Sequence, residues 1–355
     1  LILANLKVIP TESPVYDAVW GYIVPLAVPL LLFKADLRKI WKGSGRTFLA
    51  FNFSAVGTLL GAIIASFLLV KFIPEINKAA AMMTGSYIGG GINFVAMSDA
   101  FQATKNQVNA LIVADNLNMA IYFMVLMIIP ATAFFRKHYG HPYEDRVANA
   151  DIGAAGAAGQ TKAGSYWGKK EISLLDMAKA LGTTFAIVFV STEISKAINA
   201  TAAPAIIKGI FGSKYLLLTT ITCILATAFP KFLGEIRGAQ EIGTFMIYIF
   251  FVVIGAPADL KVILLQSPIL LVFCLIIVCV NMAVTFSVGK LFKFNVEELC
   301  IASNANVGGP TTAAAMAIAK GWEDLVLPAM LVGVYGYVIG NYIGLFVGTW
   351  LATIF

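Results

Sequence analysis

The sequence predicts an all-α polytopic membrane protein made of two inverted repeats, each with one broken or re-entrant glycine-rich helix. The first observation is composition: 59% of the 355 residues are hydrophobic and 12% are charged, against about 25% charged in a soluble domain. The second is three uncharged runs, 47–70, 262–289 and 325–355, each longer than the roughly 20 residues that cross a bilayer. The third is a pair of glycine-rich polar stretches at matching places in the two halves.

Hydropathy predicts eight apolar spans, at 16–33, 47–70, 108–135, 173–198, 203–229, 240–257, 262–290 and 323–354. The chain starts at Leu1, and residues 1–6 resemble the end of another span. We therefore expect roughly one to two further spans upstream.

The two glycine-rich stretches predict broken helices at 79–103 and 298–319. They run from Thr84 to Asn93 (TGSYIGGGIN) and from Ser303 to Thr312 (SNANVGGPTT). At membrane depth a broken helix persists only where protein or a wet cavity satisfies its freed backbone groups. Matching breaks in two halves point to a transporter's binding site, so we expect the two breaks to meet.

The repeats are predicted from an ordered series of matches. Each half has an Ala-Asp-Leu sequence after an apolar span, at Asp36 and Asp259, followed by a long span and then by the glycine pair. The separations are similar, 90 − 36 = 54 residues to Gly90 and 308 − 259 = 49 to Gly308. This places the first repeat at 1–135, a hydrophilic cytoplasmic linker at 136–172 and the second repeat at 173–355.

Loop charge predicts that the repeats are inverted. The connector after span 16–33 has five basic residues, whereas its counterpart after 240–257 has Lys261. Basic connectors stay cytoplasmic, so the two connectors should face opposite sides. The linker is also basic, which places it inside and makes 79–103 a hairpin that opens outside. A broken helix that crosses fully is the alternative.

Polar groups and glycines at the breaks are the candidate substrate-binding residues. Hydroxyl and amide oxygens can coordinate Na⁺, and half-helix N-termini favour an anion. Pro310 suits the first turn of a new half-helix. The alternative is that these small residues only permit close helix packing. The candidates are Ser86, Gly89, Gly90, Gly91, Asn93, Ser303, Asn304, Asn306, Gly308, Gly309, Thr311 and Thr312.

Asp115 is the candidate for ion coupling, with Asn116 and Asn118 as nearby acceptors. A carboxylate within a span is costly and is a functional hypothesis by default. It would carry a proton or bind Na⁺. The alternative is a structural carboxylate near the membrane surface, because Asp115 lies about seven residues into its span.

The sequence gives little support for metal-dependent, ATP-driven or enzymatic chemistry. The four cysteines lack metal-site spacing, and no Walker A motif is present. We expect no metal site beyond possible Na⁺, no cofactor and no nucleic-acid partner. No Ser/Lys, Asp/Asp or His-Glu-x-x-His arrangement at catalytic spacing indicates an enzyme.

Residues 85–96, the Ala-Asp-Leu-Arg-Lys loop at 35–39 and residues 302–313 resemble the membrane family labelled "domain of unknown function 819" over essentially the whole chain. That family resembles the cation:proton antiporters, bile-acid:sodium symporters and 2-hydroxycarboxylate symporters. The resemblance implies inverted repeats, central broken elements, a core and a scaffold domain, and a homodimer. Asp115 is similar to the antiporters' ion-binding aspartate. The chain has no Asp-Asp or Asn-Asp pair at this place, however, and the order here is Asp115-Asn116. The glycine-rich tips look more like those of the carboxylate symporters.

These observations predict a secondary active transporter in the plasma membrane. It would use Na⁺ or H⁺ to take up a small organic anion, such as a carboxylate, an amino acid or a short peptide, by alternating access. The first alternative is a monovalent cation/proton antiporter that binds no organic substrate. The second is a non-transporting membrane receptor or scaffold.

Overall fold

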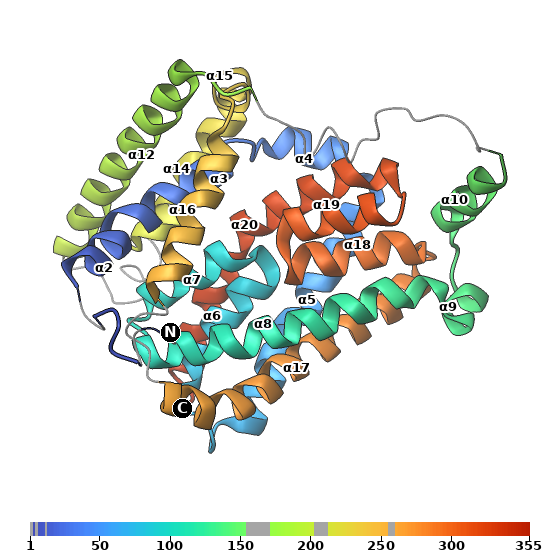
Figure 1. Ribbon diagram of the computed structural model, residues 1–355, viewed down its shortest axis with the longest axis horizontal. Coiled ribbons are helices and arrows are strands. Elements are labelled where there is room, and N and C mark those ends of the chain that lie inside the picture. Colours follow the sequence, from blue (N-terminus) through green and yellow to red (C-terminus); the bar gives the residue numbers. More distant parts are fainter. Residues whose placement is uncertain (1–2, 4–5, 11–12, 154–170, 202–211, 255–259) are drawn as a thin grey trace.

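The described part of the chain is helical throughout its regular structure. The computed structural model describes residues 3, 6–10, 13–153, 171–201, 212–254 and 260–355 (Figure 1). The N-terminal helices are α2 (Pro14–Ala18), the π-helix η1 (Val19–Ile23), α3 (Val24–Leu32), α4 (Leu37–Gly43), α5 (Gly45–Leu69), α6 (Ile76–Gly89), α7 (Gly91–Ala100), α8 (Lys105–Ile128), the 3₁₀ helix η2 (Ile129–Ala131), α9 (Ala133–His138) and α10 (Pro142–Gly153). The later helices are α12 (Leu174–Ala200), α14 (Lys214–Ala228), α15 (Pro230–Gly234), α16 (Ala239–Ile254), α17 (Leu260–Leu291), α18 (Val296–Val307), α19 (Gly309–Ala319) and α20 (Glu323–Leu351).

Six runs of helix among the described residues are long and apolar enough to cross a membrane. They are 14–32, 45–69, 105–131, 174–200, 267–291 and 323–351, and they confirm six of the eight predicted spans. The predicted span 203–229 contains the shorter α14, with 202–211 outside the described residues. The predicted span 240–257 contains α16, with 255–259 likewise outside, so Asp259 is not described.

Both predicted breaks are present, and each lies at a glycine. The backbone between α6 and α7 is interrupted at Gly90, which has φ 74°. Between α18 and α19 the positive angle is at Gly309, with φ 83°, and Pro310 follows in the first turn of α19. A left-handed φ costs glycine little, whereas a Cβ atom would strain it. The structure thus narrows each predicted break to one glycine.

The chain reverses at each break, so each helix pair brings its two ends together. We call the end of each pair that is opposite the break its base. At the base of α6–α7, the Lys78 Nζ donates to the Gln102 carbonyl (3.4 Å), and the Gln107 amide of α8 donates to the Pro74 carbonyl (3.2 Å). At the base of α18–α19, Glu297 and Lys320 both contact α10. Because α10 follows the far end of α8, the two bases lie at opposite ends of α8 (Figure 1).

Helix α20 packs against both broken helices through its glycines. A Cβ atom on Gly336 would overlap the Ile88 carbonyl oxygen of α6, and one on Gly333 would overlap Pro310 of α19. Small residues at helix interfaces let backbones approach closely. The glycines of α20 therefore bring α6 and α19 to one central helix.

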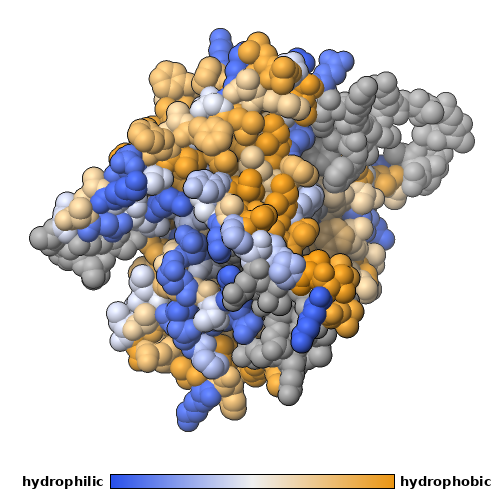
Figure 2. Space-filling view, turned by 60° about the vertical axis from the view of Figure 1, so that its left-hand side comes forward, coloured by the Kyte–Doolittle hydropathy of each residue, from blue (hydrophilic) through white to orange (hydrophobic). Residues whose placement is uncertain are grey.

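The surface has the apolar character that contact with lipid requires. Figure 2 shows continuous apolar areas on the visible face, next to hydrophilic patches. Large side chains such as Phe189 of α12 and Val252 of α16 are 66% and 77% exposed. Exposed apolar surface on this scale marks an interaction surface rather than a solvated one, which agrees with a membrane protein.

The predicted linker 136–172 contains regular structure that its composition did not predict. It includes the end of α9 and all of α10, while residues 154–170 lie outside the described residues. The backbone of Gly140, just before α10, accepts from the Val296 amide at the start of α18 (2.9 Å). The first part of the linker is thus packed against the second broken helix.

Candidate functional site

The two glycine-rich breaks meet in the structure, as the sequence predicts. A Cβ atom placed on Gly90 would lie 3.7 Å from the Gly309 Cα atom. The ring of Tyr337, from α20, would lie 3.4 Å from a Cβ on Gly90 and 3.9 Å from one on Gly309. The interrupted backbones are therefore enclosed by each other and by an aromatic side chain rather than by lipid, as unsatisfied backbone groups require.

A cavity of about 240 Å³ lies beside the first break. Ser86 of α6 and Gly91, the first residue of α7, contribute to its wall, together with Asp115 of α8. Its full lining is Ser86, Gly91, Phe94, Ile112, Asp115 and Asn116. Four predicted site residues are thus brought together from three helices: Ser86, Gly91, Asp115 and Asn116. Phe94 and Ile112 were missed, because apolar residues in an apolar span give no signal in sequence.

Asp115 has one oxygen atom without a protein partner. Its Oδ1 is buried and accepts no hydrogen bond, although the residue lines the cavity. The Tyr87 phenol lies close enough to the carboxyl to act on it electrostatically. A buried carboxylate oxygen without a donor carries a desolvation cost. A cation or a proton in the cavity would offset that cost.

A network of buried side chains that includes Tyr87 links five helices. On α8, the Asn118 amide donates to the Tyr87 hydroxyl (2.8 Å), and Tyr122, one turn later, shares a hydrogen bond with Ser303 (2.7 Å). The Ser303 hydroxyl donates to the Asn281 Oδ1 (2.8 Å). Since Tyr87 belongs to α6 and Ser303 to α18, α8 contacts both broken helices with side chains four residues apart.

Asn281 of α17 is the centre of this network. Its Nδ2 lies within hydrogen-bond distance of the Ser54 carbonyl and hydroxyl (2.9 and 2.8 Å) and of the Thr58 hydroxyl (2.9 Å), both residues of α5. Thr58 in turn donates to the Tyr87 carbonyl (3.0 Å). The contacts of this buried asparagine therefore join α17 to α5 and α18.

The predicted polar residues of α18 are fully buried, and each makes a hydrogen bond within the protein, although Asn306 Oδ1 has no partner. The Thr312 hydroxyl donates to the Asn304 Oδ1 (3.0 Å), which closes the second break on itself. The Asn306 amide donates to the carbonyls of Phe51 and Ala302 (3.0 and 3.1 Å). Ser303, Asn304 and Asn306 are each 0% exposed. They lie apart from the lining of the cavity.

The other predicted residues pack where the helices cross. The Asn93 amide donates to the Gly336 and Tyr337 carbonyls (3.3 and 3.2 Å). A Cβ on Gly89 would overlap the Asn93 side chain, and one on Gly308 would overlap the Thr312 hydroxyl. Thr311 is half-buried in the first turn of α19. For Gly89, Asn93 and Gly308 these contacts are those of close packing.

Metal ligands do not cluster in the part of the chain that the structure describes. No group of three His, Cys, Asp or Glu side chains could hold a metal ion there. Three of the four cysteines, Cys223, Cys274 and Cys300, are buried, and Cys279 is exposed. The chemistry that the described site offers is therefore that of a carboxylate, hydroxyls, amides and a half-helix N-terminus.

The helices and the site define a multi-pass membrane protein whose two broken helices meet beside a buried carboxylate. The chain belongs to the family described as "Protein of unknown function (DUF819)", which matches residues 1–354. It is 48% identical over 353 residues to the "Uncharacterized membrane protein YjcL" of Bacillus subtilis (strain 168). That match covers 99% of this chain and 88% of the relative. Membership confirms a membrane protein and names no substrate.

Proposed function

We propose that this protein is a secondary active transporter that couples Na⁺ or H⁺ to the uptake of a small organic anion by alternating access. The observation that carries the proposal is the meeting of Gly90 and Gly309 next to a cavity that contains Asp115. Broken helices that meet inside a membrane protein, at a cavity with an ionisable group, are the arrangement of transporter binding sites.

The cavity offers complementary groups to an anion and a cation. Gly91 begins α7, so the backbone N–H groups of its first turn present partial positive charge. Asp115 and Asn116 supply oxygen ligands for a cation on another wall. An organic anion at the α7 N-terminus and Na⁺ at Asp115 would neutralise each other. A volume of about 240 Å³ favours a carboxylate or an amino acid over a peptide.

The contacts of the two bases support inverted, re-entrant helix pairs. The ends of α6–α7 lie beside the start of α8, whereas those of α18–α19 lie beside α10, beyond its end. If α8 spans the bilayer, the two pairs enter from opposite faces. With the basic linker inside, α18–α19 would open to the cytoplasm and α6–α7 to the outside.

A thermal-shift screen of organic anions with purified protein, with and without Na⁺ and at several pH values, tests the proposal. We expect a small carboxylate to raise the melting temperature more when Na⁺ or acidic pH accompanies it, because a ligand of the folded state stabilises it. Uptake of the radiolabelled hit into proteoliposomes under an ion gradient would establish transport. No ion-dependent ligand and no gradient-driven uptake would reject it.

Cation/proton antiport is the second candidate. Asp115 is an acid among the cavity-lining residues, which include no basic side chain. One carboxylate that alternates between Na⁺ and a proton needs no organic substrate. A pH-dependent Na⁺ effect on melting temperature, without any effect of organic anions, would favour this candidate.

A further inference from the structure

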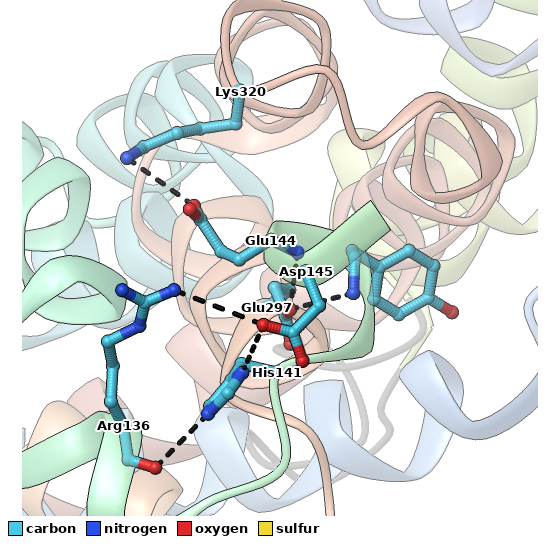
Figure 3. Close-up of polar contacts among 7 residues, drawn as sticks. Arg136, His141, Glu144, Asp145, Glu297 and Lys320 are labelled. Atoms are coloured by element: carbon cyan, nitrogen blue, oxygen red, sulfur yellow. Dashed lines mark hydrogen bonds and ion pairs between the residues drawn. The ribbon is translucent and has the colours of Figure 1, made fainter. Parts of the chain in front are cut away.

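Helix α10 is hydrogen-bonded to the second broken helix through a carboxylate of α18 that takes no part in the capping box of α18. Two glutamates stand in the first turn of α18. Glu298 closes the capping box of its own helix with Asn295, to whose backbone it bonds at 3.1 Å. Glu297 instead accepts hydrogen bonds from the backbone N–H groups of Tyr143 and Glu144, at 2.9 and 3.0 Å (Figure 3). A charged acceptor from α18 thus caps the N-terminus of α10.

The contacts of α10 extend across the whole base of α18–α19. Lys320, just after α19, pairs with Glu144 (3.6 Å; Figure 3), and Arg146 pairs with Asp324 of α20 (2.5 Å). The Val147 side chain would lie 3.0 Å from a Cβ on Gly321. One short helix of the linker therefore holds the start of α18, the end of α19 and the start of α20. Burial also raises the pKa of the Tyr143 phenol in this interface.

The interface is polar and incompletely satisfied. Glu297 is 0% exposed, yet its Oε2 atom has no hydrogen-bond partner. The Glu144 carboxylate is close enough to repel the Glu297 carboxylate. Buried, unpaired charge penalises the docked state relative to one in which water reaches both carboxylates. Polar, charge-rich interfaces within a chain are typical of parts that separate and rejoin.

We propose that α10 is a latch on α18–α19. Docked, it holds the base of the broken helix in the conformation described here, and it releases that base when the broken helix moves during transport. That α10 is docked on α18–α19 follows from the contacts alone, whereas its release when the broken helix moves rests on the proposed transport function. The α6–α7 base is held differently: Gln107 of α8 donates to the Pro74 carbonyl, and Phe101, just after α7, packs against Gly348 of α20.

Hydrogen exchange on the purified full chain tests the docking. We expect Glu297→Ala to speed exchange of the Tyr143 and Glu144 amides by about tenfold or more, because both lose their acceptor. Glu297→Gln should have a smaller effect, since its amide oxygen still accepts. Glu193→Ala is the control, because it removes an exposed ion pair within α12 (Lys196–Glu193, 2.8 Å). Unchanged α10 exchange in both Glu297 variants would overturn the proposal.

Spin labels test the release. Labels at Arg146→Cys and Asp324→Cys, with Cys279→Ser to remove an exposed thiol, report the separation of α10 from α20; that exposed pair contributes little to docking. We expect a close and a distant population, with Glu297→Ala enriching the distant one. A single close population at all Na⁺ concentrations and pH values would overturn the latch. Neither measurement requires a substrate, so absent uptake would count against the transport function alone.

Discussion

The two broken helices are alike in outline and opposite in what their polar groups do. In α6–α7, Ser86 and Gly91 face a cavity shared with Asp115. In α18–α19, Ser303, Asn304 and Asn306 are buried and bonded to other helices or across their own break. The two glycine-rich sequences have therefore folded into one element that faces an open space and one whose polar residues are bonded within the core. We infer that ligands meet the first element, whereas the polar groups of the second bond its helices to their neighbours and to each other.

The largest effect is expected when the charge of the cavity-lining carboxylate is removed. Asp115→Asn keeps the shape of the side chain but not its charge, so we expect it to abolish the stabilisation by Na⁺ or by acidic pH. At a Na⁺ concentration 100-fold above Kd, about 2.7 kcal/mol of stabilisation would be lost. The measurement is melting temperature against Na⁺ concentration.

Asp99→Asn is the matched control for this prediction. Asp99 lies near the C-terminus of α7, whereas Asp115 lies in α8, and Asp99 is outside the cavity lining. It should leave the Na⁺ response intact. An undiminished Na⁺ response in Asp115→Asn would make Asp115 structural and would return coupling to the uncharged oxygens near the breaks.

The second prediction tests whether the first element packs against α20. In Gly336→Ala, the added methyl would overlap the Ile88 carbonyl of α6, which is backbone and cannot rotate away. Overpacking of this kind costs about 1–3 kcal/mol, and thermal unfolding in detergent measures it. Gly182→Ala on α12 is the control, since nothing lies within 4 Å of its Cβ. Equal melting temperatures for the two variants would mean that α6 and α20 are not packed as described.

The third prediction concerns the hydrogen bonds that hold α18 to α17 and α17 to α5. Asn281→Leu removes the acceptor of Ser303 and the donor to Ser54 and Thr58. Bonds between membrane helices are worth about 0.6 kcal/mol each on average, so we expect a loss of about 2 kcal/mol in unfolding free energy. The Na⁺ response should persist in the protein that remains folded. Loss of that response without loss of stability would place Asn281 in the ligand site instead of among the residues that hold the helices together.

The smallest effect is expected at the base of α6–α7. Gln107→Leu removes the hydrogen bonds to the Pro74 and Glu75 carbonyls, at about 1 kcal/mol. Hydrogen exchange should speed up at the start of α6 and stay unchanged in α10, whereas Glu297→Ala should do the reverse. Faster exchange at both bases in either variant would show that the two elements open together rather than separately.

Local chemistry in the sequence determined where the helices break. Glycine accepts a positive φ without strain, and Pro310 suits a first-turn position, so residue type predicted interruptions within Gly89–Gly91 and at Gly308–Gly309. Composition likewise determined the membrane class, because long uncharged spans have few other stable environments. The predicted segments 79–103 and 298–319 lie within three residues of the helices observed.

Only the tertiary structure decided which polar residues face the cavity and which are used in packing. Ser86 and Ser303 each precede the break of a broken helix by a few residues, yet the first lines the cavity and the second bonds to Asn281. That choice depends on the partner that a neighbouring helix presents, and single-chain patterns carry no such information. The same holds for Glu297, an ordinary first-turn glutamate in sequence, whose role appears only when α10 folds back across the base of α18–α19. Hydrogen bonds are short-ranged and directional, so residue type sets what a side chain can bond, and the packing of distant helices sets whether it does.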